Sequence, residues 1–255
     1  MTDVPKLLFG FIFVIFILMK TDTQLKFSNN VFLFPFIFVF LIWFIYWVEI
    51  TFGLNFNKYG VAPRKFYGLR GVLASPFIHG NASHLFNNSV PLFVLLLCLF
   101  YFYKKVAIKV LIYGLVSTGI LTWVIASNSY HIGASGIVYL LFSFVFFSGI
   151  IRKHYRLVAV SLIIIFLYGS MIWYVLPIKE GMSWEGHLSG LISGFILAAF
   201  YRKSGIVKEK YEFSKTDFDD MFDEEGNYIP PETKEEDVLT KLPEIHYKYF
   251  YKEEE

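Results

Sequence analysis

The sequence predicts an all-α membrane protein with six transmembrane helices. Hydrophobic residues make up 56% of its 255 positions and charged residues only 17%, whereas soluble domains have about 45–50% and 25%. The apolar residues are concentrated in long uncharged runs, and a run of about 20 such residues can cross a bilayer. Six stretches reach or approach this length: 31–49, 84–103, 106–126, 134–150, 157–176 and 185–201.

A shorter apolar segment precedes the first of these spans. Residues 7–19 lie between Lys6 and Lys20 and number only 13, which suits an interfacial segment or a signal-like apolar core better than a span. No small-residue cleavage site follows them, so we do not expect removal as a signal peptide. Translation from Met19 is a further alternative, and the sequence leaves these readings open.

The formal charge of +2 is the sum of two unlike parts. Residues 1–201 carry 14 Lys and Arg against 5 Asp and Glu, a net of +9, and residues 202–255 carry 9 against 16, a net of −7. Nothing in this pattern favours nucleic-acid binding. The single cysteine, Cys98, excludes an internal disulfide and a cysteine-based zinc site. We expect three parts: an N-terminal segment (1–30), a six-helix domain (31–201) and an acidic, largely disordered cytoplasmic tail (202–255).

The basic residues of the short loops predict the orientation, because Lys and Arg are enriched on the cytoplasmic side. Four groups fall on one side of the membrane: Lys20 and Lys26; Lys104, Lys105 and Lys109; Arg152, Lys153 and Arg156; and Arg202, Lys203, Lys208 and Lys210. The loop 50–83 disagrees, since it carries four cations on the other side. Weighing four groups against one, we expect a multi-pass protein of the cell (inner) membrane with both termini in the cytoplasm.

In this topology the second, fourth and sixth spans all start at the outer face, and each start carries unusual polar residues. Polar groups in a bilayer are costly unless they face protein or a water-filled cavity. Three chain segments with polar residues at one depth therefore predict one shared cavity. The residues are His84, Asn87, Asn88 and Ser89 in the second span, Gly133 to Gly136 at the fourth, and Gly186 and His187 at the sixth.

Missing residue types narrow the chemistry of this cavity. No Asp or Glu occurs between Glu49 and Glu180, which excludes an aspartyl dyad and the His-Glu-x-x-His metalloprotease helix within the spans. Glu185 lies two residues before His187, so on a helix the two side chains point to nearly opposite sides. A serine–histidine dyad remains, in which His187 acts as general base toward Ser135. We expect no metal and no cofactor.

Other polar residues at the same depth can support such a dyad. The backbone N–H of Ser135 at a helix start is a natural donor to a developing oxyanion. His84 and Asn88 are four residues apart, hence on one helical face, and could supply further donors. Tyr139, four residues after Ser135, could pack against the ring of His187.

Three motifs resemble the signatures of the rhomboid family of intramembrane serine proteases, in the order of that family. They are His79-x-x-x-x-His84-x-x-x-Asn88, Gly133-x-Ser135-Gly136 and His187-x-x-Gly190-x-x-x-Gly194. The resemblance covers about residues 31–201 and implies a six-helix bundle that cuts transmembrane protein substrates near the outer membrane surface. The lipid bilayer is then its second partner. The sequence fixes neither the natural substrate nor the oligomeric state.

The resemblance also implies roles for individual residues. Ser135 would be the nucleophile, His187 its base, and His84 and Asn88 the lining of the oxyanion site, with Tyr139 packed on the base. The fifth span and its neighbouring loop, 157–184, would be the gate for substrates. The remaining motif residues would have supporting or packing roles: Gly133, His79, Gly136, Gly190 and Gly194. One departure is the first loop, which has no tryptophan where many bacterial members carry a Trp-Arg pair.

Two other function classes are compatible with parts of the sequence. A rhomboid-like pseudoprotease would bind membrane proteins without cutting them, but such relatives usually lack the nucleophile or the base, and both are present here. A transporter or metal-binding protein could use His79, His84 and His187. Transporters tend to show repeat symmetry and helices interrupted at mid-membrane, and the sequence displays neither.

Overall fold

A computed structural model describes residues 28–178, 181–206, 216 and 218–229. The short apolar segment 7–19 and the alternative start at Met19 lie outside these residues. The chain divides into two compact units, Met1–Lys208 and Glu209–Glu255. Each unit is described by itself below.

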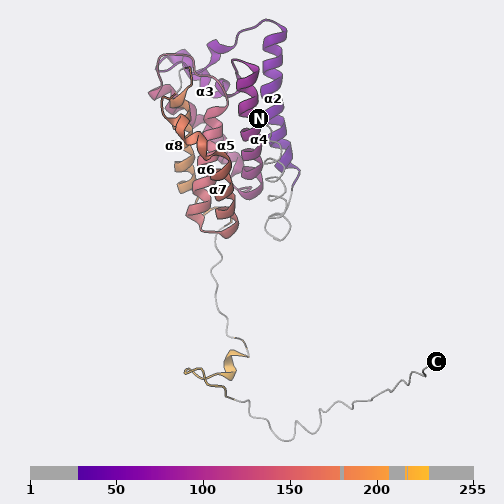
Figure 1. Ribbon diagram of the computed structural model, residues 1–255, viewed down its shortest axis with the longest axis vertical. Helices are drawn as coiled ribbons and strands as arrows, with labels where there is room; N and C mark the ends of the chain where they lie inside the picture. Colours follow the sequence, from indigo (N-terminus) through magenta and orange to yellow (C-terminus); the bar gives the residue numbers. More distant parts are fainter. Residues whose placement is uncertain (1–27, 179–180, 207–215, 217, 230–255) are drawn as a thin grey trace, which may run out of the picture. The chain divides into compact units, whose positions relative to one another are not determined.

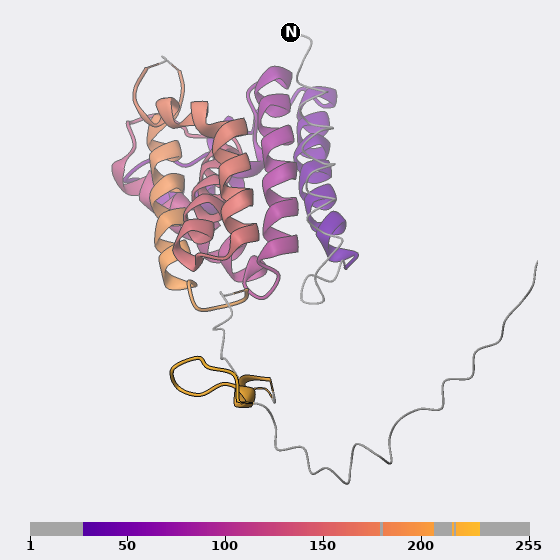
Figure 2. The same ribbon diagram turned by 60° about the horizontal axis from the view of Figure 1, so that its bottom comes forward.

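The described part of the first unit is a helical bundle (Figure 1). Its helices are α2 (Asn30–Thr51), α3 (Gly71–Ala74), α4 (Ala82–Phe102), α5 (Ala107–Ile125), α6 (Ser135–Arg152), α7 (Tyr155–Tyr168) and α8 (Trp184–Phe200). The long helices run side by side in both views (Figures 1 and 2). No β-strand occurs in the described ranges, where only isolated bridges pair extended residues. The all-α membrane fold predicted from the sequence is confirmed.

Each predicted span falls on a helix, and helix bounds differ from the predicted ones by at most two residues except in the fifth span. There α7 ends at Tyr168, and the chain continues as the 3-10 helix η4 (Gly169–Val175). The change occurs at Gly169, and glycine is the poorest helix former after proline. Within the described part of the chain, five helical stretches are long and apolar enough to cross a membrane: α2, α4, α5, α6 and α7 with η4. The sixth, α8, has 17 residues.

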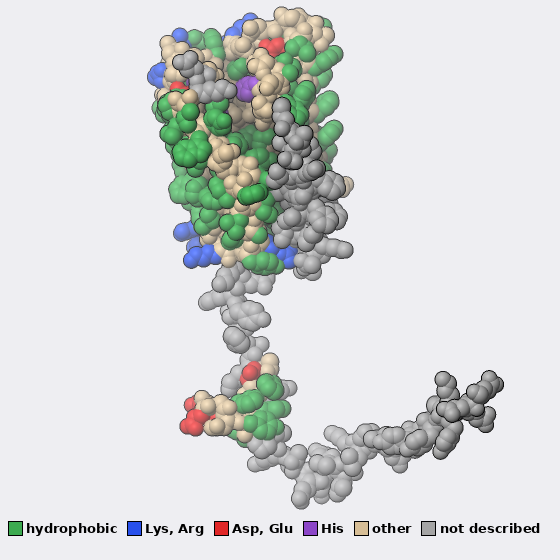
Figure 3. Space-filling model, viewed as in Figure 1, with side chains coloured by type: hydrophobic (Ala, Val, Ile, Leu, Met, Phe, Trp, Pro, Cys, Tyr) green, Lys and Arg blue, Asp and Glu red, His purple; other side chains and the backbone are tan. Residues whose placement is uncertain are grey.

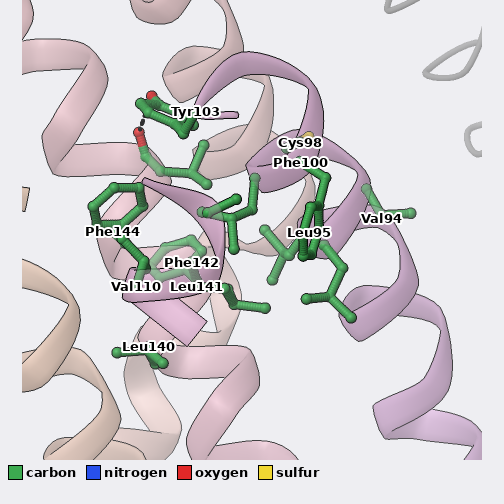
Figure 4. Packing of buried hydrophobic residues seen from close by; sticks show 14 of the residues in the cluster. Val94, Leu95, Cys98, Phe100, Tyr103, Val110, Leu140, Leu141, Phe142 and Phe144 are labelled. Atoms are coloured by element: carbon green, nitrogen blue, oxygen red, sulfur yellow. Dashed lines mark hydrogen bonds between the residues drawn. The ribbon is translucent and has the colours of Figure 1, made fainter. Parts of the chain in front are cut away.

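The centre of the bundle is built on α4 and α6, because both helices bury side chains on most of their circumference. Tyr103, Phe142 and Phe144 are almost wholly buried, and they belong to one cluster with Leu95 of α4 and Leu141 of α6 (Figure 4). By contrast, α2, α5 and α7 leave most of their apolar side chains partly or fully exposed. In a bilayer such side chains face lipid, which is as apolar as they are.

The helices α6 and α8 approach each other most closely, and glycines make this possible. A Cβ atom on Gly190 would lie 2.2 Å from the carbonyl oxygen of Gly136, and one on Gly194 would lie 2.3 Å from that of Leu140. Real Cβ atoms do not approach backbone so closely, so only glycine fits at these positions. The two helices that carry Ser135 and His187 are therefore held together backbone to backbone.

Basic side chains gather at the end of the bundle where α4, α6 and α8 finish, and others lie at the opposite end (Figure 3). Arg152 is buried, and its guanidinium donates to the carbonyl oxygen of Tyr201 at 2.8 Å and to Ser148 Oγ at 2.9 Å. It thus ties the last turn of α6 to the last turn of α8, where helix carbonyls favour a cation.

Part of the disagreement of loop 50–83 with the charge rule has a structural reason. Arg64 donates to the carbonyl oxygens of Val124 and Ala126, so it binds the carboxyl end of α5. Arg70 lies over the ring of Tyr59, with its guanidinium carbon 4.7 Å from the ring centre. These two cations hold the loop in place, and a charge with such a role says little about orientation.

The described part of the second unit is a short turn structure within the acidic tail. A 3-10 helix, η5 (Asp219–Met221), precedes an isolated bridge between Phe222 and Tyr228. The carboxylate of Asp223 accepts hydrogen bonds from the backbone and side chain of Asn227, which lowers the pKa of Asp223. Most of the tail that we expect to be disordered lies outside the described residues.

Candidate active site

One cavity of about 940 Å³ opens where α4, α6 and α8 begin. Its lining comes from these three helices, from the loop segments that precede them and from η4. Six of the residues singled out in the sequence line it: His84, Asn87, Asn88, Ser135, Tyr139 and His187. Segments that lie far apart in the chain, such as those of His84 and His187, therefore bring their polar side chains to one place, as their common depth in the spans predicts.

Ser135 is the first residue of α6. Its backbone N–H is one of the four that a helix start leaves without an intrahelical partner. The chain reaches this position through Gly133, whose φ of +107° lies in the region that favours glycine. A Cβ atom there would also lie 2.8 Å from Nε2 of His84. Gly133 therefore lets the backbone before Ser135 pass close to His84.

His187 is held by two contacts on different helices. Its ring stacks on that of Tyr139, with 4.2 Å between centres and 11° between planes. Its Nδ1 lies 2.8 Å from the carbonyl oxygen of Tyr174 in η4. A carbonyl oxygen can only accept, so Nδ1 carries the hydrogen and Nε2 keeps its lone pair. His187 itself is buried, with 5% of its surface exposed.

The 3-10 segment η4 is bound to the site a second time through Tyr139, whose hydroxyl donates to the carbonyl oxygen of Met171 at 2.6 Å. The contact at Tyr174 could not be predicted from the sequence, because a backbone acceptor is present at every residue. His131 was also missed as a site residue. This histidine is buried and lines the cavity.

The remaining predicted residues lie around the cavity. Asn88 donates from Nδ2 to the carbonyl oxygen of His84 at 3.1 Å, which leaves its second amide hydrogen for another acceptor. His79 does not line the cavity; its Nε2 accepts a hydrogen bond from the backbone N–H of Ala134 at 3.3 Å. Burial, together with the neighbouring His84, lowers the pKa of His79 to about 4, so this ring is a neutral acceptor at pH 7.

A model of the Rhomboid domain family matches residues 67–204, which is 138 of the 255 residues. The chain belongs to the rhomboid family. The range matched by the rhomboid model begins in the loop after α2 and ends after α8, so it contains all three motifs and the cavity.

Several mycobacterial proteins are similar to this rhomboid-family chain. Uncharacterized proteins of Mycobacterium tuberculosis and Mycobacterium bovis are 32% identical to it over 187 residues, covering 67% of this chain and 77% of theirs. An uncharacterized protein of Mycobacterium leprae is 29% identical over 184 residues, covering 65% of this chain and 72% of its own.

Two further features bear on the chemistry of this rhomboid site. Within the described ranges, Ser135 and His187 line the same cavity without a direct hydrogen bond between them. Catalytic hydrogen bonds are often long without substrate and shorten when it binds. Among the same residues, no three His, Cys, Asp or Glu side chains are grouped so that they could hold a metal ion.

Proposed function

We propose that this rhomboid-family protein is an intramembrane serine endopeptidase that hydrolyses transmembrane substrates through a dyad of Ser135 and His187. The observation that carries the proposal is the state of His187. Its Nδ1–H is bound to the carbonyl oxygen of Tyr174 and its ring is stacked on Tyr139, so Nε2 keeps a lone pair in the cavity that Ser135 lines. An oriented imidazole with a free lone pair is what general-base catalysis by histidine requires.

In the acylation step, Ser135 Oγ attacks the carbonyl carbon of the scissile peptide bond and gives its proton to Nε2 of His187. The carbonyl oxygen takes up the electron pair of the C=O π bond and becomes an oxyanion. When the tetrahedral intermediate collapses, the C–N bond breaks and Nε2 returns the proton to the leaving amine. The acyl group is then an ester of Ser135.

Donors for the oxyanion come from α6 and from α4. The N–H of Ser135 lies at the N-terminal end of α6, where the helix dipole favours negative charge. His84 and Asn88 line the same cavity from α4. Loss of one such donor in serine proteases costs about 2.7–4 kcal/mol of transition-state stabilisation.

Deacylation needs a water molecule, and a second, smaller cavity lies behind Ser135. Its volume is about 40 Å³, and Ser135, Thr118, Thr122 and His131 are among its polar lining residues. A site with polar partners needs about 10–15 Å³ for each water, so this cavity has room for a few. His187 would take a proton from such a water as the water attacks the ester carbon. The bond between that carbon and Ser135 Oγ then breaks, and Nε2 returns the proton to Oγ, which restores the serine.

The carbonyl oxygen of Tyr174 takes the orienting role that an aspartate has in a catalytic triad. It fixes the tautomer of His187 and favours the imidazolium that forms during attack, but it carries no net charge. An ionised carboxyl group near the middle of a bilayer costs about 2.5–3.5 kcal/mol or more. A neutral acceptor avoids this cost.

We also propose an orientation. The cavity lies at the starts of α4, α6 and α8, at the end opposite the cations Lys104, Lys105 and Lys153. With those cations in the cytoplasm, the site faces the outer side of the cell membrane and both termini are cytoplasmic. Substrates would then be cut near the outer membrane surface.

Labelling with a fluorophosphonate probe in native membranes tests the nucleophile. We expect the wild-type protein to be labelled and Ser135→Ala to be unlabelled. Ser83→Ala is the matched control, because Ser83 lines the same cavity from α4 and should leave labelling unchanged. An unlabelled wild type, or labelling of Ser135→Ala, would contradict the dyad.

Cleavage of a model transmembrane substrate in proteoliposomes tests hydrolysis. The proposal expects cleavage by the wild type and none by His187→Ala. Binding of the substrate by the wild type without any cleavage would instead favour a pseudoprotease.

A further inference from the structure

Two hydrogen bonds join the loop before Ser135 to the start of the helix that carries His187. The backbone N–H of Ser127 donates to Oε1 of Glu185 at 2.9 Å, and Ser183 Oγ lies 2.6 Å from Nδ1 of His131. Ser127 and His131 belong to the loop between α5 and α6, whereas Ser183 and Glu185 flank the first residue of α8. Both bonds therefore cross between the two segments that carry the proposed dyad.

Every polar atom of His131 has a hydrogen-bond partner. Its backbone N–H and carbonyl pair with those of Val61, each bond being 2.9 Å long. Its Nε2 lies 3.0 Å from the carbonyl oxygen of Ser127, so Nε2 carries the hydrogen. In the neutral ring Nδ1 is then the acceptor, and the hydroxyl of Ser183 donates to it. With 6% of its surface exposed, His131 has the surroundings of a core residue.

Glu185 is buried as well, with 4% of its surface exposed. It is the second residue of α8, where the positive end of the helix favours an acidic side chain. Ser183 stands at the N-cap position but makes no side-chain cap to α8. An N-cap serine usually bonds the backbone of its own helix. Here its hydroxyl is bound to His131 instead.

We infer that His131 and Glu185 form a two-point clamp that sets the position of Ser135 relative to His187. Each member is close in sequence to a member of the dyad, His131 four residues before Ser135 and Glu185 two residues before His187. This clamp rests on the proposed protease function. Its members are positioning residues, because they act on the reacting atoms through the loop and the helix.

Glu185 acts in the clamp as a hydrogen-bond acceptor and not as the acid of a triad. The Nδ1–H of His187 is already bound to the carbonyl oxygen of Tyr174, and the carboxyl oxygen Oε1 is bound to Ser127. A glutamine has the same Oε1 acceptor without the acid. The clamp therefore predicts that a glutamine at position 185 preserves activity and that an alanine there does not.

The first experiment compares Glu185→Gln with Glu185→Ala in the full-length protein in proteoliposomes. We expect Glu185→Ala to lower kcat for a model transmembrane substrate about 10- to 100-fold with KM within twofold, since displacement of reacting groups by about 1 Å can cost 100-fold. Glu185→Gln should stay within threefold of wild type. The matched control is Ser189→Ala, one turn further along α8, whose hydroxyl bonds the backbone carbonyl of Glu185. It should leave kcat unchanged.

A double variant tests whether the two points act together. If they form one clamp, His131→Ala with Glu185→Ala should lower kcat no more than the worse single variant, because residues acting as a unit are not additive. Multiplication of the two single losses would overturn the clamp. So would wild-type kcat in both single variants, or an equal loss in Glu185→Gln and Glu185→Ala.

Hydrogen–deuterium exchange tests the clamp without any catalysis. We expect Glu185→Ala to speed exchange of the amides in residues 126–134 at least tenfold and Glu185→Gln to leave it at the wild-type rate. Unchanged exchange in Glu185→Ala would overturn the clamp whatever the activity. A wild type that neither cleaves nor labels, yet exchanges as expected in both variants, would instead refute the protease proposal and leave the clamp standing as a structural contact.

Discussion

The helix pairs α6–α8 and α2–α4 pack in opposite ways. Between α6 and α8, glycines let backbone touch backbone, and a Cβ atom on Gly190 would lie 2.2 Å from the carbonyl oxygen of Gly136. Between α2 and α4, large side chains make the contact. Phe34 stacks on Phe100 with 4.6 Å between ring centres, and Trp43 donates to Ser89 Oγ at 3.0 Å.

This difference matters because the two kinds of contact respond differently to change. Side chains at a partly exposed contact can adopt other rotamers and repack, often at a cost below 1.5 kcal/mol. Two backbones in contact can only move apart. The pair that carries Ser135 and His187 is of this second kind, so the geometry of the proposed dyad depends on glycine at a few positions.

The largest effect is expected for Gly190→Ala. Its Cβ would overlap the carbonyl oxygen of Gly136, so α8 must shift away from α6 and carry His187 with it. We expect a loss of about 1–3 kcal/mol of stability or more, and at least a 100-fold loss of fluorophosphonate labelling. Thermal unfolding in detergent and labelling rates measure the two effects.

Gly169→Ala is the control for that substitution. A Cβ on Gly169 would meet only the flexible side chain of Ile165, at 3.2 Å, so labelling should persist. Labelling of Gly190→Ala at the wild-type rate would show that the α6–α8 contact does not govern the site.

The next effect is a dependence of stability on pH that comes from His79, in the loop before α4. His79 accepts a hydrogen bond from the N–H of Ala134, and burial lowers its pKa from 6.5 to about 4. Between these pH values the unfolded chain binds more protons than the folded one, so stability falls as the pH falls from 6.5 to 4. The free energy of unfolding falls by about 3 kcal/mol at most through this group, because each unit of pKa difference corresponds to 1.36 kcal/mol.

Melting temperatures from pH 7 to pH 4, compared between the wild type and His79→Gln, isolate this contribution. Glutamine can still accept from Ala134 but does not titrate, so its melting temperature should fall less. Parallel curves for the two proteins would mean that another group causes the pH dependence.

Much of this fold and site could be predicted from the sequence, because segments that cross a bilayer must be long and almost free of charged residues. Apolar runs placed the spans, and polar residues at span starts pointed to one cavity that His84, Ser135 and His187 do line. What could not be predicted depends on backbone groups. The carbonyl oxygen of Tyr174 binds His187, and the N–H of Ser127 binds Glu185, yet neither contact depends on the side chain of the residue that supplies it.

Two other residues have surroundings that cannot be predicted from the neighbouring sequence. The charge pattern counted Arg152 as a loop cation, but it is buried against the last carbonyls of α8. The sequence around His131 does not show that this residue is buried, yet a bridge to Val61 holds it inside the protein. In both cases a partner distant in sequence decides the environment.

A smaller effect is expected for Tyr139→Phe. This substitution removes the hydrogen bond of the tyrosine hydroxyl and keeps the stacked ring. The phenylalanine ring can still stack on His187, but the hydrogen bond to the carbonyl oxygen of Met171 is lost. One such bond contributes about 0.5–1.5 kcal/mol, so we expect labelling to fall several-fold. Tyr139→Leu also removes the stacking and should lose more. Equal labelling in the two variants would mean that the stacked ring does not orient His187.

The smallest effect is expected on the other helix pair, for Trp43→Phe. This substitution removes the N–H that donates to Ser89 Oγ, but the hydroxyl of Ser89 still donates to the carbonyl oxygen of Leu85 at 2.7 Å. No buried polar group is left without a partner, so the loss of stability should stay below about 1.5 kcal/mol, and labelling should match wild type. A fall in labelling as large as that of Gly190→Ala would mean that α2 governs the site as firmly as α8 does. The contrast between side-chain and backbone packing would then have no bearing on catalysis.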